Sequence, residues 1–352
     1  FALADPLVQV AAGRLPRRSL LLGGLATLAA GCLGSAWAPD YPTLVAARVL
    51  MALGACAVGP VASSLGAGLV PADRQGHALS VVFGGMTIAT VLGLPLVTAL
   101  SRVWGWRAMF AGLAAASLLV ALAVALLVRD RRPSAPVTLA SFAQVFARPA
   151  ATWAIAMAMG YMAAQFAMYA LVAVYLQDRF GVPAPALPLA FLLAGVSSVI
   201  GNLAAGRMGD RLGASRTLAI TVTALAGTFL VVPALPPGAA IGMAAFAGWS
   251  LIGMAFYAPQ QKRLIALAPD LRNLLLAMNA SALYIGMSLG SAAAAQVART
   301  AGVRWLPLLA VAFLCLTLAA FASSRRAERR TGVDPGAAAG AAAHPPPGSD
   351  DR

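Results

Sequence analysis

The sequence predicts an all-α polytopic membrane protein, and three observations carry this prediction. Of the 352 residues, 61% are hydrophobic and 10% are charged, whereas soluble globular chains carry about 25% charged residues. The apolar segments run for about 20 residues or more, which is enough for a helix to cross about 30 Å of hydrocarbon. The basic residues gather at the ends of these segments. We therefore expect a bundle of membrane-spanning helices.

Long apolar runs that end at proline, glycine or charged residues predict the helices in two groups. The first group is expected at 1–12, 19–38, 43–70, 77–100 and 107–128. The second group is expected at 151–176, 186–207, 215–233, 238–261, 272–298 and 303–324. The run at 1–12 is too short to cross a bilayer by itself.

These two groups predict two transmembrane halves. The N-terminal half covers 1–128, a basic cytoplasmic linker covers 129–150, and the C-terminal half covers 151–324. Residues 325–352 are rich in Arg, Ala, Gly and Pro and cannot bury a core, so we expect a disordered tail there.

Basic residues in the short loops predict the orientation, because Lys and Arg are retained on the cytoplasmic side. When successive loops are assigned alternately to the two sides of the membrane, one side receives most of the basic residues. The other side has only Arg102, Arg107, Arg179, Arg299 and Arg304. We expect a multi-pass protein of the inner (plasma) membrane with a cytoplasmic C-terminus. The net charge of +14 then reflects these loops, and nucleic acid is not an expected partner because no aromatics are interleaved with the arginines.

One offset of 197 residues relates the two groups of helices, which is typical of transporter repeats. The pairs it makes include Arg14 with Arg211, Leu15 with Leu212, Asp73 with Asp270, Gly93 with Gly290, Gly105 with Gly302, and Arg107 with Arg304. Applied backwards, the same offset puts the partner of 151–176 before Phe1. We therefore expect a design of six plus six helices in which the first helix and part of the second are missing from this chain.

Catalytic and metal-binding patterns are not found in the sequence. Cys32, Cys56 and Cys315 lie alone in apolar stretches, while His77 and His344 lie outside the expected helices. A membrane enzyme would need a nucleophile, acid/base groups or metal ligands that converge in the bundle. No Gly-x-x-x-x-Gly-Lys loop is present, which argues against a fused ATP-driven pump. We expect no cofactor and no metal, and an ion gradient as the energy source.

The loop between two helices of the second half carries a recognisable motif, Gly206-Arg207-Met208-Gly209-Asp210-Arg211-Leu212-Gly213. With it the chain resembles the major facilitator superfamily over its folded length, and within it the drug/proton antiporter group of arabinose-efflux-permease-like exporters. In the first half, Gly13 stands where the family has Asp. A carboxylate at a helix end can accept charge-assisted bonds that latch one conformation, so the resemblance implies gating by Gly206, Asp210, Arg211 and Gly213. A solvated turn is the alternative.

Two further motifs of the first half are similar to those of the family. Arg48, in Ala47-Arg48-Val49, resembles the fourth-helix motif; the resemblance implies proton coupling or gating, and snorkelling to an interface is the alternative. Gly84, Gly93 and Pro95 resemble a partial antiporter motif of the fifth helix, and ordinary close helix packing explains them as well.

Asp5 is the one acid that the predicted helices place inside the membrane, about 12 Å from the helix end at Gly13. Burial there favours the protonated carboxyl, as a proton carrier needs. We hypothesise that Asp5, or an acid on the missing first helix, couples protons to transport. A wetted end near Phe1 is the alternative.

The substrate cavity is expected between the halves near mid-membrane. Tyr161, Gln165, Met168 and Tyr169 recur at spacings of three and four, which forms one helix stripe. Asn279 lies in Asn279-Ala280-Ser281-Ala282, similar to a pattern of arabinose-efflux-like members. Packing is the alternative for the stripe.

The resemblance implies a secondary active transporter: a proton-coupled exporter of a drug, sugar or nucleobase-like metabolite by alternating access. The partners would be a small-molecule substrate, protons and the lipid bilayer, with a monomer as the expected state. An uptake permease and a non-transporting membrane fragment are the alternatives.

Overall fold

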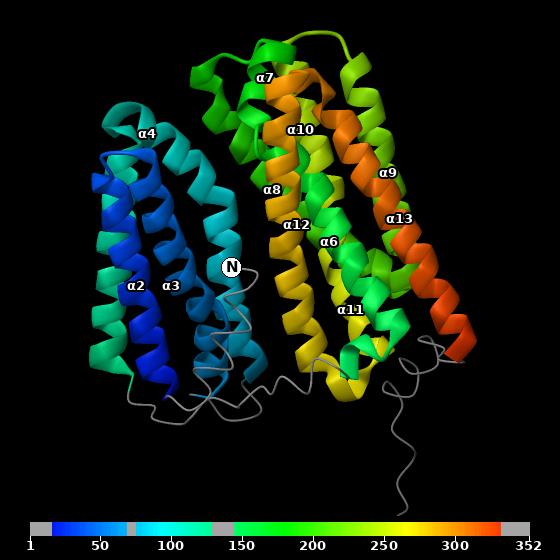
Figure 1. Ribbon diagram of the computed structural model, residues 1–352, viewed down its shortest axis with the longest axis horizontal. Coiled ribbons are helices and arrows are strands. Elements are labelled where there is room, and N and C mark those ends of the chain that lie inside the picture. Colours follow the sequence, from blue (N-terminus) through cyan, green and yellow to red (C-terminus); the bar gives the residue numbers. More distant parts are fainter. Residues whose placement is uncertain (1–15, 69–74, 129–143, 332–352) are drawn as a thin grey trace, which may run out of the picture. The chain divides into compact units, whose positions relative to one another are not determined.

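The computed structural model describes residues 16–68, 75–128 and 144–331, and the elements that it assigns there are helices (Figure 1). The contacts divide the chain into two compact units. Unit 1 contains Phe1–Leu139 and Pro183–Val196, and unit 2 contains Ala140–Val182 and Ser197–Arg352. Each unit is described by itself below.

Unit 1 is built on α2 (Arg17–Trp37), α3 (Tyr41–Gly68) and α4 (Gln75–Leu127). Within α4, Gly105 has φ 76° and ψ 159°, and the ribbon folds back on itself there (Figure 1). Glycine adopts this positive φ without the steric cost of a side chain. The helices expected at 77–100 and 107–128 are thus the two arms of α4.

The turn between α2 and α3 is closed by polar contacts. Asp40 accepts a hydrogen bond from the Thr43 backbone N–H at 2.8 Å, which caps the start of α3. Bonds from the Thr43 side chain and then its N–H lower the pKa of the Asp40 carboxyl. The cap is therefore present above the ordinary carboxyl pKa and is lost as the pH falls through the lowered one. Arg107 donates to the Ala38 carbonyl at 2.9 Å.

Unit 2 holds the remaining helices, with the boundary between the units falling inside α8. They are α6 (Pro149–Tyr169), α7 (Val172–Phe180), α8 (Leu187–Leu212), α9 (Ala214–Val231), α10 (Ala239–Met254), α11 (Tyr257–Leu267), α12 (Arg272–Thr300) and α13 (Leu306–Thr331). The central helix α6 packs against α12 and α13. A Cβ at Gly286 or Gly290 of α12 would overlap the carbonyls of Met159 or Ala163 on α6, so these glycines allow the helices to approach closely.

Two of the expected spans are broken. The helix expected at 151–176 consists of α6 and α7, bent by 51°. The helix expected at 238–261 consists of α10 and α11 and continues to Leu267. Pro259 explains this second break, because it cannot donate to the Ala255 carbonyl four residues earlier and its ring crowds that carbonyl. No proline or glycine lies at the first break.

The all-α polytopic prediction is confirmed. In the described ranges, seven helical segments are long and apolar enough to cross a membrane when α10 and α11 are counted as one, and α6 with α7 would make an eighth. The prediction of a disordered tail at 325–352 is wrong for its first residues, because α13 continues through Thr331. The run at 1–12, most of the linker and the rest of the tail lie outside the described residues.

Candidate functional site

The face of α6 toward α10 carries the first predicted site residue, Tyr161. Its hydroxyl donates to the Gly253 carbonyl at 2.7 Å, and its ring stacks on Phe256 with centroids 3.9 Å apart and planes 7° apart. Gly253 lies at the end of α10, and its helical donor would be the N–H of Tyr257, beyond the break. Tyr161 therefore supplies a donor where the helix ladder is interrupted.

Gln165 and Tyr169 follow Tyr161 on the same face. A Cβ at Gly253 would lie 2.2 Å from Gln165 Nε2, so glycine at this position makes room for the amide. The ring centroids of Tyr169 and of Phe246 on α10 lie 6.1 Å apart. Tyr161 is fully buried, whereas Gln165 and Tyr169 are half-buried. The three predicted residues thus share one polar and aromatic face.

Asn279 lies elsewhere, in the interior of unit 2. Its side chain is 4% exposed, and its Oδ1 lies 3.4 Å from Gln260 Nε2. Gln260 also donates to the Ala154 carbonyl at 2.7 Å. Asn279 therefore lies at a packed junction of α6, α11 and α12, and its part in a substrate cavity stays a prediction.

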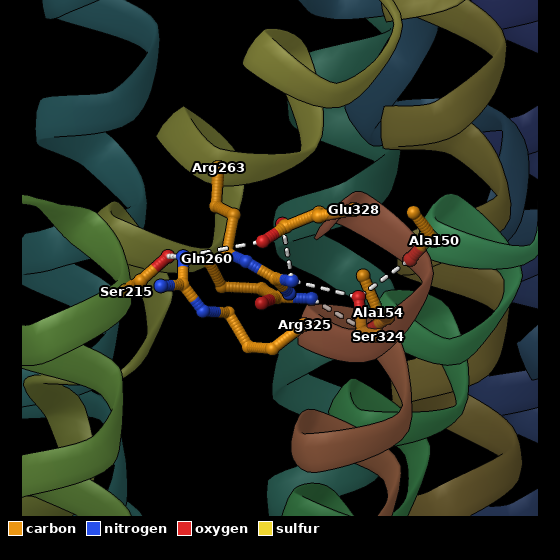
Figure 2. Close-up of polar contacts among 8 residues, drawn as sticks. All are labelled: Ala150, Ala154, Ser215, Gln260, Arg263, Ser324, Arg325 and Glu328. Atoms are coloured by element: carbon orange, nitrogen blue, oxygen red, sulfur yellow. Dashed lines mark hydrogen bonds and ion pairs between the residues drawn. The ribbon is translucent and has the colours of Figure 1, made fainter. Parts of the chain in front are cut away.

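A buried ion pair lies at the end of unit 2 where α11 and α13 finish (Figure 2). Arg263 Nη2 donates to Glu328 Oε1 at 2.6 Å and to Ser324 Oγ at 2.7 Å. Ser324 in turn donates to the Ala150 carbonyl at 2.6 Å. The Arg263 and Glu328 side chains are 1% and 4% exposed, so the charges face each other with little solvent between them.

Arg325 extends this cluster to α9. Its Nη1 lies 3.2 Å from Glu328 Oε2 and donates to Ser215 Oγ at 3.2 Å. The cluster thereby joins α6, α9, α11 and α13 at one end (Figure 2).

The sequence reasoning missed this cluster, because it assigned Arg263 to a loop and Glu328 to the tail. Both assignments are wrong, since α11 ends at Leu267 and α13 at Thr331. One signal was available: Ser324 and Glu328 are four residues apart, which places them on one face of a helix that continues past 324.

The motif from Gly206 to Gly213, called the Asp210 motif below, lies at the turn from α8 to α9. Asp210 Oδ1 lies 2.7 Å from Lys262 Nζ on α11, with side chains 74% and 50% exposed. Such an exposed pair contributes about 0–1 kcal/mol. Gly213 makes the turn with φ 82°, while Gly206 is helical with open space at its Cβ position. Arg211 is exposed.

The predicted residues of unit 1 lie on two helices. On α3, the exposed Arg48 places its guanidinium carbon 4.6 Å from the Phe110 ring centroid, a cation–π distance. Gly84, Gly93 and Pro95 lie in α4, which remains helical through Pro95. Asp5 lies outside the described residues.

The sequence matches a known protein family. A family model described as Major Facilitator Superfamily matches residues 1–265. The chain belongs to the Major Facilitator Superfamily. The resemblance expected from the Asp210 motif is thereby confirmed, and the family consists of transporters rather than enzymes.

Relatives of this superfamily member include a "Chloramphenicol resistance protein" of Streptomyces lividans, 37% identical over 236 residues. That match covers 65% of this chain and 59% of the relative, so the alignment spans under two thirds of the relative's length. The "Inner membrane transport protein YdhP" of Escherichia coli O157:H7 is 31% identical over 333 residues, which cover 91% of this chain and 83% of the relative.

Solved superfamily structures share the fold. A bacterial homologue of the human lysosomal transporter Spinster matches with a TM-score of 0.72 and 17% identity, over 92% of this chain and 86% of the other. The E. coli fucose:proton symporter FucP matches with a TM-score of 0.61 and 16% identity, over 92% and 87%.

Proposed function

We propose that the full-length protein is a secondary active exporter of small organic compounds, driven by a proton gradient and working by alternating access. The observation that carries this proposal is the 37% identity with a protein named for chloramphenicol resistance. A neutral aromatic compound such as chloramphenicol is therefore the first substrate to test.

The α6 face supports a substrate of this chemistry. Tyr161 and Tyr169 offer phenol groups and rings, and Gln165 offers an amide. Ligand sites combine apolar or aromatic walls with a few polar groups, and transporters often form them at discontinuous helices such as α10 and α11. Tyr161 and Asn279 are packed here, so contact with substrate requires unit 2 to rearrange at the break.

Coupling and gating are assigned to separate residues in this proposal. Asp5 carries the proton, and the exposed Arg48 tunes or gates that transfer. Asp210 with Arg211, between Gly206 and Gly213, forms a latch that opens in each cycle; its exposed pairing with Lys262 is weak enough to break repeatedly.

The proposed setting is the inner membrane, with the end of unit 2 that carries Asp210, Arg263 and Glu328 on the cytoplasmic side. The protein acts as a monomer, and its two halves are 1–128 and 151–324.

The test uses everted membrane vesicles that contain the full-length protein and are acidified inside by respiration. Added chloramphenicol should be accumulated and should release part of the stored proton gradient, because export in cells is uptake in everted vesicles. Gln165→Leu should lower the rate, whereas the control Gln296→Leu, at an exposed position of α12, should not. Accumulation only in right-side-out vesicles would indicate an uptake permease instead.

A further inference from the structure

Six arginines gather at one end of unit 2. They are all exposed, and within the described ranges none of them takes part in a hydrogen bond or ion pair. They are Arg207 and Arg211 of α8, Arg216 of α9, and Arg326, Arg329 and Arg330 of α13.

The acids nearby do not compensate them. Asp210 and Glu328 are the acids at this end whose side chains the structure describes. Asp210 pairs with Lys262, and Glu328 lies between Arg263 and Arg325. Both carboxylates are thus matched by other cations, so no carboxylate that the structure describes neutralises the six arginines.

The structure holds these arginines together. Arg325 donates to Ser215 and ties the end of α13 to the start of α9. Gly213 joins α8 to α9 through a tight turn. The Arg263–Glu328 pair fixes the last turns of α13, so Arg326, Arg329 and Arg330 extend from an anchored helix.

Their expected position is the level of the lipid headgroups. The candidate membrane spans of α8, α9 and α13 cover Ala184–Leu212, Ala214–Ala234 and Val303–Arg330. The six arginines lie in the last two turns of α8 and α13 and the first turn of α9, where we expect these spans to leave the hydrocarbon. Guanidinium groups bind phosphate oxygens in a bidentate fork, and each basic residue near an anionic surface adds binding energy.

We propose that these six arginines form a binding surface for the phosphate groups of anionic phospholipids. The surface would keep this end of unit 2 at the membrane interface through the transport cycle, and Arg211 would belong both to it and to the proposed latch. The proposal does not depend on substrate or on the direction of transport.

The test compares two triple variants of the full-length protein in detergent. Arg326→Gln/Arg329→Gln/Arg330→Gln removes half of the surface. The control, Arg102→Gln/Arg299→Gln/Arg304→Gln, removes three exposed arginines at other helix ends. Binding of phosphatidylglycerol and of phosphatidylcholine is measured by native mass spectrometry, and thermal unfolding checks that both variants fold.

Phosphatidylglycerol should bind the parent more tightly than phosphatidylcholine, and added salt should weaken it. The first triple variant should lose about fivefold in affinity for each arginine removed, and the control should lose less than threefold in total. Equal losses in both variants, or equal binding of the two lipids, would overturn the proposal. Displacement of the lipid by millimolar inorganic phosphate, or tighter binding of a short oligonucleotide, would likewise contradict a lipid surface.

Discussion

Arg263 of α11 and Glu328 of α13 form an ion pair of 2.6 Å with both side chains almost fully buried. The two paired residues are 65 positions apart in sequence. Removing one partner of a buried pair leaves an uncompensated charge, which costs about 3–5 kcal/mol. The cluster around Arg263 is therefore expected to hold unit 2 together at this end.

Glu328→Gln should lower the stability of unit 2 by about 3–5 kcal/mol, measured by thermal or denaturant unfolding in detergent. The exposed pair supplies the matched control, since Asp210→Asn should cost about 1 kcal/mol or less. The double variant Arg263→Met/Glu328→Leu should recover much of the loss. If Glu328→Gln and Asp210→Asn cost the same, the buried pair has no special role.

Gly290→Ala should destabilise the packing of α12 on α6 by about 1–3 kcal/mol, because its Cβ would overlap the Ala163 carbonyl. Its repeat partner Gly93 is the control: a Cβ there meets no described atom within 4 Å, so Gly93→Ala should be nearly neutral. Unfolding midpoints of both variants check this difference. A loss at Gly93 equal to that at Gly290 would be inconsistent with the packing described.

Tyr161→Phe should lose the hydrogen bond to the Gly253 carbonyl at a cost of about 1 kcal/mol, while the stacking on Phe256 remains. Gly253→Ala should cost more, because the new Cβ displaces the Gln165 amide. Adding Gln165→Ala should relieve that clash. Stability measurements on the three variants test this, and the absence of any rescue by Gln165→Ala would place the strain elsewhere.

Gly213→Ala should lower stability by about 1–3 kcal/mol, since Gly213 has φ 82° and an alanine is strained there. Gly206→Ala should have little effect, because Gly206 is helical and has open space around it. Unfolding measurements distinguish the two motif glycines. Equal sensitivity would contradict the open space around Gly206.

The helices of unit 2 were predicted well where the sequence marks their ends. Gly213 has a positive φ immediately before α9, and Gly302 has one immediately before the short turn that precedes α13. Both glycines interrupt the apolar pattern in the sequence. The break between α10 and α11 could have been predicted, because Pro259 has no backbone N–H to donate. The bend between α6 and α7 could not, since Tyr169, Ala170 and Leu171 carry no helix-breaking signal.

The contacts around the candidate site could be predicted only in part, and the reason is tertiary packing. Helix spacing correctly placed Tyr161, Gln165 and Tyr169 on one face, but which helix they meet depends on Gly253 of α10. Arg263 looked like a loop residue because a lone charge near a span end is usually solvated. Its burial follows from Glu328, and that pairing cannot be read from local sequence.

The central claim is proton-driven export, and transport in proteoliposomes tests it most directly. The full-length protein is reconstituted, and uptake of radiolabelled chloramphenicol is followed after an imposed pH jump that leaves the lumen acidic. The account predicts accumulation against the substrate gradient, abolished by a protonophore and by Asp5→Asn. Accumulation that persists without a pH gradient, or is driven only by the opposite gradient, would contradict it.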